Sequence, residues 1–146
     1  MTEMSMVLDW MYTTLASDTQ LQGLAPGGVW RSEVPTGTDT APTPVPYVVV
    51  TYQPHQSQDV IAFQAVRAYS ELYFEVVIVG PVTDWSTLTL GAARIDTLLT
   101  IGQQTAVTGG TISAGYRTQP IEVDPLVAGE IQTNTGGVYK FMAKAT

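Results

Sequence analysis

The chain has 146 residues, of which 45% are hydrophobic and only 13% charged, and its net charge is −7. This length predicts one domain over residues 1–146, and the composition excludes a highly charged disordered chain. The six Lys and Arg residues are scattered, which excludes a protein that gains its affinity by following nucleic-acid phosphates. The absence of cysteine excludes disulfide scaffolds and thiolate chemistry.

The first predicted element is an amphipathic helix that ends at about Ser17, with Thr2 or Ser5 as its N-cap. Its apolar residues recur at the helical spacings of four, three and four: Met4, Leu8, Met11 and Leu15. Glycine and proline then break the pattern, and residues 29–34 form a short extended segment. The proline-rich segment 36–46 cannot nucleate a helix, so we expect it to be an exposed loop.

The middle of the chain contains two predicted strands. Residues 47–52 are β-branched and aromatic, which favours a central strand. Residues 71–79 alternate, and this pattern predicts a half-buried antiparallel strand whose inner face carries Leu72, Phe74, Val76 and Ile78. The connection over residues 53–67 is far longer than the roughly two to five residues of a tight hairpin loop. We therefore expect a functional loop or an extended hairpin there.

A second helix follows Thr83 or Asp84 and ends before Gly102, with Leu88, Ala92, Ile95 and Leu99 as its apolar stripe. The remainder reads as strands separated at Gly109-Gly110, Asp124-Pro125 and Gly136-Gly137, and the last strand covers residues 138–142. These elements predict an α+β fold. We expect a two-layer sandwich in which a mainly antiparallel sheet of about four to five strands packs against two helices.

Few residues could carry catalysis. His55 is the only histidine, so it is the only candidate base of a Ser-His-Asp arrangement, and its polar surroundings favour a solvated loop residue. Glu71 and Glu75 share a strand face, but this does not place a cleft between them, and Arg67 offers them a salt bridge. Gly109-Gly110 lacks the lysine of a phosphate-binding loop. We therefore predict no catalytic residues.

A metal site would require several converging carboxylates or histidines. Glu122 and Asp124 lie two residues apart and Glu130 follows a turn, which favours a solvated acidic edge. We expect neither a metal nor a cofactor. The N-terminus lacks a basic leader, and the longest uncharged stretch after the proline-rich region, residues 97–116, contains glutamines and glycines. We therefore expect neither a signal peptide nor a membrane span.

The order of several short segments is informative over nearly the whole chain. Between a helix near the N-terminus and a helix over residues 88–99 stand Gly-Gly-Val-Trp at 27–30, Pro-Tyr-Val-Val-Val at 46–50 and Glu-Leu-Tyr-Phe-Glu-Val-Val-Ile at 71–78. Gly-Val-Tyr-Lys-Phe follows at 137–141. In this order and spacing the chain resembles the tail terminator, or tail completion, proteins of long-tailed (siphovirus-type) bacteriophages.

The resemblance implies a structural protein of the virion without enzymatic activity. It implies a homo-oligomeric ring, usually of six copies, which caps the tail tube protein, ends tube polymerisation and joins the head-tail connector or stopper protein. Such a ring sits at the head-proximal end of the tail and is assembled in the host cytoplasm. The residues also leave open another neck or minor tail component, or a non-viral carbohydrate- or protein-binding domain.

The net charge fits DNA passage without specific binding. Six copies would carry a charge of about −40, which repels DNA from the channel wall. The candidates for an acidic channel are Asp59, Glu122, Asp124 and Glu130.

We expect the contact with the tube or the neighbouring subunit in the segment 53–67. Apolar groups on such an excursion are costly to leave in water unless a partner covers them. The candidate interface residues are Gln53, His55, Gln58, Val60, Ile61, Phe63, Val66 and Arg67. The alternative is that the apolar residues pair across the two arms of an extended hairpin, and both interpretations can hold together.

Overall fold

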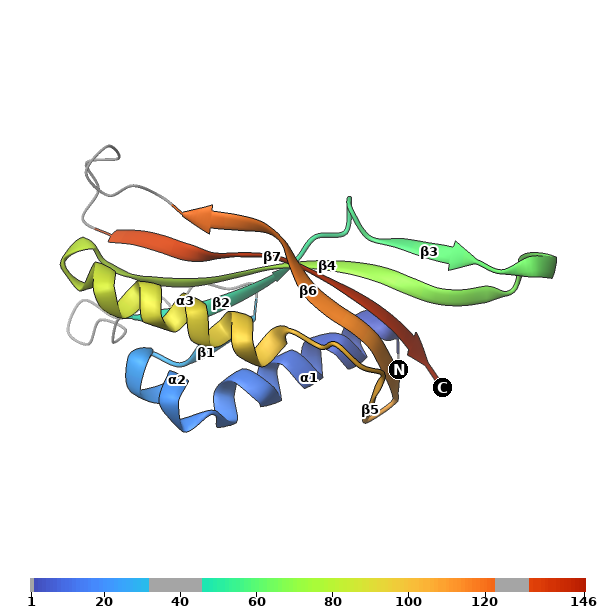
Figure 1. Cartoon of the computed structure of the whole chain (residues 1–146), viewed down its shortest axis with the longest axis horizontal. Coiled ribbons are helices and arrows are strands. Elements are labelled where there is room, and N and C mark those ends of the chain that lie inside the picture. The colour runs from blue at the N-terminus through green and yellow to red at the C-terminus, as the bar shows by residue number, and fades with distance from the viewer. Residues whose placement is uncertain (1, 32–45, 123–131) are drawn as a thin grey trace.

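The computed structural model describes residues 2–31, 46–122 and 132–146 (Figure 1). Nearly all of the proline-rich segment, together with Asp124 and Glu130, lies outside the described residues. The helices are α1 (Glu3–Ser17), α2 (Thr19–Leu24) and α3 (Trp85–Leu99), with short 3-10 turns at Phe63–Ala65 and Val82–Asp84. The strands are β1 (Val29–Arg31), β2 (Tyr47–Tyr52), β3 (Gln58–Ile61), β4 (Arg67–Pro81), β5 (Thr105–Val107), β6 (Gly110–Glu122) and β7 (Gln132–Ala145).

The strands form one sheet in the order β1-β2-β4-β7-β6-β5, and β3 pairs with the beginning of β4. The β1-β2 pair is parallel, and the other pairs are antiparallel. The helices cover one side of the sheet, where their apolar residues meet those of β2, β4 and β7 (Figure 1). The predicted α+β class and mainly antiparallel sheet are therefore confirmed. No helix in the described ranges is long and apolar enough to cross a membrane.

The predicted numbers of elements were too low. The described residues form seven strands and three α-helices instead of four to five strands and two helices. The elements absent from the prediction are short, since α2 has six residues and β3 has four, whereas β1 lies in the predicted extended segment 29–34. Elements of this length carry little periodicity of their own, and long-range pairing stabilises them.

The first helix begins at the predicted Thr2 cap. The Thr2 side chain accepts a hydrogen bond from the Ser5 backbone, and the Ser5 side chain bonds back to the Thr2 backbone, which forms a capping box. The buried face differs from the predicted stripe, since Met4 and Leu8 are only partly buried. The fully buried residues of α1 include Glu3, a carboxylate with partners described below, and four apolar residues: Met6, Val7, Met11 and Leu15.

The core is centred on the predicted inner face of β4. Phe74 is fully buried, and its ring packs against Tyr52 and Phe141 at centroid distances of 5.3 and 6.0 Å. Leu88, Ile95 and Leu99 of α3 belong to the same cluster, as predicted. The buried Tyr139 hydroxyl donates to Asp96 of α3 over 3.0 Å, and burial raises the pKa of this phenol.

A bidentate ion pair joins the helices to each other. Arg94 of α3 donates to both carboxylate oxygens of Asp18, over 2.6 and 2.9 Å. The same carboxylate caps α2 by accepting from the Leu21 backbone at 2.9 Å. The Arg94 hydrogen bonds hold the pKa of Asp18 below its ordinary value. The pair therefore ties the α1-α2 connection to α3.

Gly136 and Gly137 do not separate two strands, contrary to the prediction. Both lie inside the continuous strand β7, and the last strand is much longer than residues 138–142. A Cβ atom at Gly136 would collide with the Val76 carbonyl oxygen, and one at Gly137 would meet the Arg117 side chain. Glycine is required there because neighbouring strands approach closely.

Phe74→Ala should reduce the free energy of unfolding by about 3 to 5 kcal/mol, because it removes a fully buried ring and leaves a cavity. Chemical denaturation measures the loss. Phe63→Ala is the matched control, since the Phe63 side chain is 90% exposed and its removal should change the unfolding free energy little. Equal effects of the two substitutions would contradict the assigned core.

Candidate functional site

The segment predicted to carry the contact is a projecting hairpin, here called the arm (residues 58–71). It consists of β3, the Phe63–Ala65 turn and the first part of β4. β2 pairs with β4 only from Phe74 onward and β7 only from Ser70 onward, so the start of β4 pairs with β3 alone. The arm therefore extends past the body of the sheet (Figure 1).

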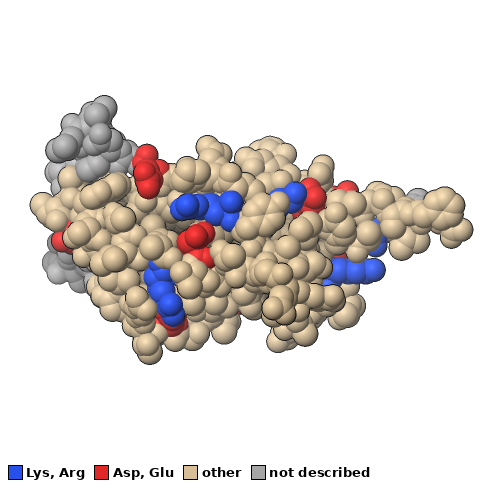
Figure 2. Space-filling model, in the orientation of Figure 1, with Lys and Arg blue, Asp and Glu red and all other residues tan. Residues whose placement is uncertain are grey.

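The arm tip (residues 61–66) carries three exposed apolar side chains. Phe63 is 90% exposed, and Ile61 and Val66 are each 59% exposed. The turn is closed by a 2.7 Å hydrogen bond from the Ala62 amide to the Val66 carbonyl, and Gln64 adopts a φ of 65°. None of the tip residues is charged, and the far end of the arm is uncharged in the space-filling view (Figure 2).

Ile61, Phe63 and Val66 do not cover one another across the two strands of the hairpin, because all three remain exposed to water. Covering a large apolar side chain contributes about 1.5 to 3 kcal/mol, so three exposed together favour association with a partner. Clusters of this kind mark interaction sites on protein surfaces. The arm tip is therefore a candidate interaction surface among the described residues.

An ion pair beside the arm tip ties the arm to the body. Arg67 contacts the Glu3 carboxylate at 2.7 Å, although Glu3 is only 5% exposed. The same carboxylate accepts a 3.2 Å hydrogen bond from the Ala145 amide at the end of β7. Asp59 lies 4.0 Å from Arg67 and accepts a 2.6 Å hydrogen bond from Ser70. The start of α1 and the end of β7 therefore hold the arm in position.

A second group of polar residues fixes the arm from the other sheet face. Glu71 accepts a 2.9 Å hydrogen bond from Gln58 and forms a 3.1 Å ion pair with Lys140 of β7. These contacts, with the Gln58 bond as the largest cause, hold the pKa of Glu71 below its ordinary value of 4.5. The Glu71 hydrogen bond in turn raises the pKa of Lys140.

The candidate interface residues do not share one surface. Ile61, Phe63 and Val66 expose apolar side chains at the tip, whereas Gln58 and Arg67 form polar contacts with Glu71 and Glu3. Of the remaining three, Val60 is half-buried and His55 is exposed in the turn before β3. The backbone N–H of Gln53 donates to the Tyr73 carbonyl. Arg67 does not bridge Glu71 and Glu75 as expected, because Glu3 and Asp59 are its partners.

Asp59 and Glu122, the two candidate channel acids that the structure describes, lie far apart. Asp59 lies beside Ser70 in the arm, whereas Glu122 is aligned, through Thr135 of β7, with Ile78 of β4. These positions on β4 are eight residues apart, or roughly 26 Å along the strand. The described part of the chain contains no cluster of acids or histidines that could hold a metal ion.

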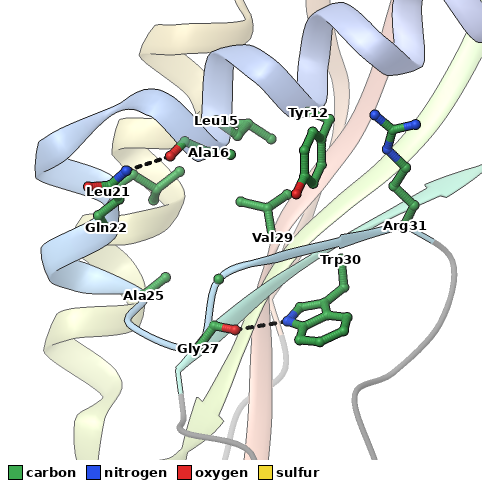
Figure 3. Close-up of a pocket in the computed structure, with 11 residues that line it drawn as sticks. Tyr12, Leu15, Ala16, Leu21, Gln22, Ala25, Gly27, Val29, Trp30 and Arg31 are labelled. Atoms are coloured by element: carbon green, nitrogen blue, oxygen red, sulfur yellow. Dashed lines mark hydrogen bonds between the residues drawn. The ribbon is translucent and has the colours of Figure 1, made fainter.

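The sequence analysis did not predict a groove of about 730 Å³ between α1, α2 and β1 (Figure 3). Its lining includes Tyr12, Leu15, Leu21, Ala25, Val29 and Trp30. The Trp30 indole donates to the Gly27 carbonyl over 2.8 Å, which holds the ring at the mouth of the groove. Three consecutive elements build this surface, and the sequence signal for it was the aromatic residue in Gly-Gly-Val-Trp.

Comparison with solved structures found protein chains that share this fold. A chain of the virion of a native gene transfer agent particle matches with a TM-score of 0.73 and 14% identity over 97% of each chain. A second solved protein, whose name states no function, matches with a TM-score of 0.59 and 14% identity over 100% of this chain and 99% of that chain. No family model and no curated protein matches the sequence. The chain therefore shares its fold with a component of a gene transfer agent virion.

Arg67→Ala should destabilise the protein by about 1 to 3 kcal/mol, because it leaves the buried Glu3 carboxylate without its cation. Glu3→Gln should reduce the cost of Arg67→Ala, since no buried charge then remains. A double-mutant cycle in chemical denaturation measures the coupling. Additive effects of the two substitutions would show that the pair does not fix the arm.

Glu71→Gln should cost on the order of 1 kcal/mol at neutral pH, because the Lys140 pair is lost. The pKa of Glu71 is lowered on folding, so its contribution is complete above about pH 4.5 and disappears as the pH falls through the lowered value. Denaturation curves of both proteins should converge in acid. Glu75→Gln, at a position without an ion pair in the described structure, is the control and should show no such convergence.

Proposed function

We propose that this chain is a structural virion protein that forms a ring on the head-proximal end of a tail tube. The ring caps the tube, ends polymerisation of the tube protein and offers its other face to the head-tail connector. The observation that carries the proposal is the fold shared with a gene transfer agent virion chain over 97% of both chains. That relationship also points to a non-enzymatic role.

The arm supports assembly as the role of the fold. It exposes three large apolar side chains on a hairpin, and the Arg67–Glu3 and Glu71–Lys140 ion pairs tie this hairpin to the body. An anchored projection of this kind loses little conformational freedom on binding, so more of the apolar contact energy remains available for affinity. Contact between copies or with the tube is the function that such an arm performs best.

The order of segments along the chain supports the position at the tube end. It resembles tail terminator proteins, as described above, and the structure places the matching segments in α1, β1, β2, β4, α3 and β7. Another neck or minor tail component would share the fold and differ only in its place in the particle. The experiment below distinguishes these positions, because loss of a protein that caps the tube leaves tube growth unchecked, whereas loss of another neck component does not.

Replacing both Ile61 and Phe63 by Ser should leave the monomer folded, with a nearly unchanged thermal midpoint, because both side chains are exposed. Tube capping should fail, so that tails grow to irregular lengths and do not join heads. Calorimetry measures the midpoint, and electron microscopy measures tail length. Leu90→Ser is the matched control, since Leu90 is a 60% exposed leucine on α3, outside the arm.

The possible results separate the alternatives. Tails of normal length that fail to join heads would assign the chain to another neck component. Tails of normal length that also join heads would contradict the proposed function. Unfolding of the double variant would show that the arm tip belongs to the core.

A further inference from the structure

The arm tip and the groove lie at opposite ends of the molecule. In Figure 1 the tip projects beyond β3 at one end of the long axis, and α2 and β1, which flank the groove, lie toward the other end. The tip therefore cannot reach the groove of its own chain. Two different surfaces at opposite ends are the arrangement that a head-to-tail contact between identical subunits requires.

The groove has the apolar and aromatic surface that the tip needs. Leu15 and Val29 form part of its wall, and Figure 3 shows Tyr12 and Trp30 beside them. Tyr12 is 37% exposed and Trp30 39% exposed, so both rings offer surface that a partner could cover. Exposed aromatic residues beside an apolar pocket are typical of the centres of protein interfaces.

The charges of the two surfaces are also compatible. The only charged residue among those that line the groove is Arg31, which pairs with Asp9 at 2.9 Å and lies 4.4 Å from the Tyr12 ring centre. The tip brings no charge of its own. Docking would therefore bury apolar surface without leaving an unpaired charge, which is the condition for a favourable buried contact.

We propose that the arm tip of one copy docks into the α1-α2-β1 groove of the next copy, with Phe63 as the anchor. The contact is heterologous, so repeated docking produces a closed ring when the rotation between copies closes. This inference rests on the proposed function only in that copies assemble with one another. It adds the identity of the two surfaces that meet.

Disulfide trapping tests the contact, because the chain contains no cysteine. An Ala62→Cys protein is mixed with an Ala16→Cys protein under oxidising conditions, alone and on tail tubes. Ala62 neighbours Phe63 at the tip, and Ala16 lines the groove. Ala106→Cys is the matched control, since this exposed alanine lies on β5 at a different hollow.

We expect a disulfide dimer of Ala62→Cys with Ala16→Cys and at least tenfold less product with Ala106→Cys. A chain that carries both Ala62→Cys and Ala16→Cys should give a ladder of linked copies, and adding Phe63→Ser should remove it. Equal trapping by Ala106→Cys, trapping only between two tips, or no product in either sample would overturn the inference.

Two further results separate this inference from the proposed function. If Ala62→Cys is protected from alkylation only by tail tubes, and no groove product forms, the arm binds the tube and docking between copies is wrong. If groove dimers form but the double Ile61 and Phe63 variant still gives tails of normal length, docking holds and the capping function is wrong.

Discussion

The length of β4 is the constraint on which the rest of the structure depends. Its fifteen residues span roughly 50 Å, and its two ends belong to different parts of the molecule. The part from Leu72 onward carries the inner face that the helices cover, and the part before it carries one side of the arm. Because one continuous strand runs through the core and the arm, the packing of the core sets the direction in which the arm projects. Its direction is further set by the Arg67–Glu3 and Glu71–Lys140 ion pairs, which tie the arm to the body from opposite faces of the sheet.

The chain has few charged residues, and four of its six cationic side chains form ion pairs within the chain. These four are Arg31, Arg67, Arg94 and Lys140. The arm tip is uncharged, and the one cation of the groove is already paired. Association through these surfaces would therefore depend on apolar burial and respond only weakly to salt. This property suits a permanent part of a particle, where subunits stay bound after assembly.

Much of the fold could be predicted from local pattern, and the rest depended on distant partners. The alternation in β4 gave its inner face correctly, and the apolar residues 61–66 pointed to the arm tip. The burial of Glu3 could not be read from α1, because its partner Arg67 lies 64 positions further along the sequence. Gly136 and Gly137 were interpreted as a break because the crowding that requires them comes from neighbouring strands. The groove was missed for a different reason, since it depends on how α1, β1 and the six-residue helix α2 pack together, and so short a helix carries little pattern.

Electron microscopy of the purified protein mixed with tail tubes tests the central claim most directly. The account predicts a ring at the end of each capped tube, with the arm of each copy seated on an adjacent copy. Tube ends that never carry a ring, or rings in which the arm tips point into solvent without a partner, would contradict it.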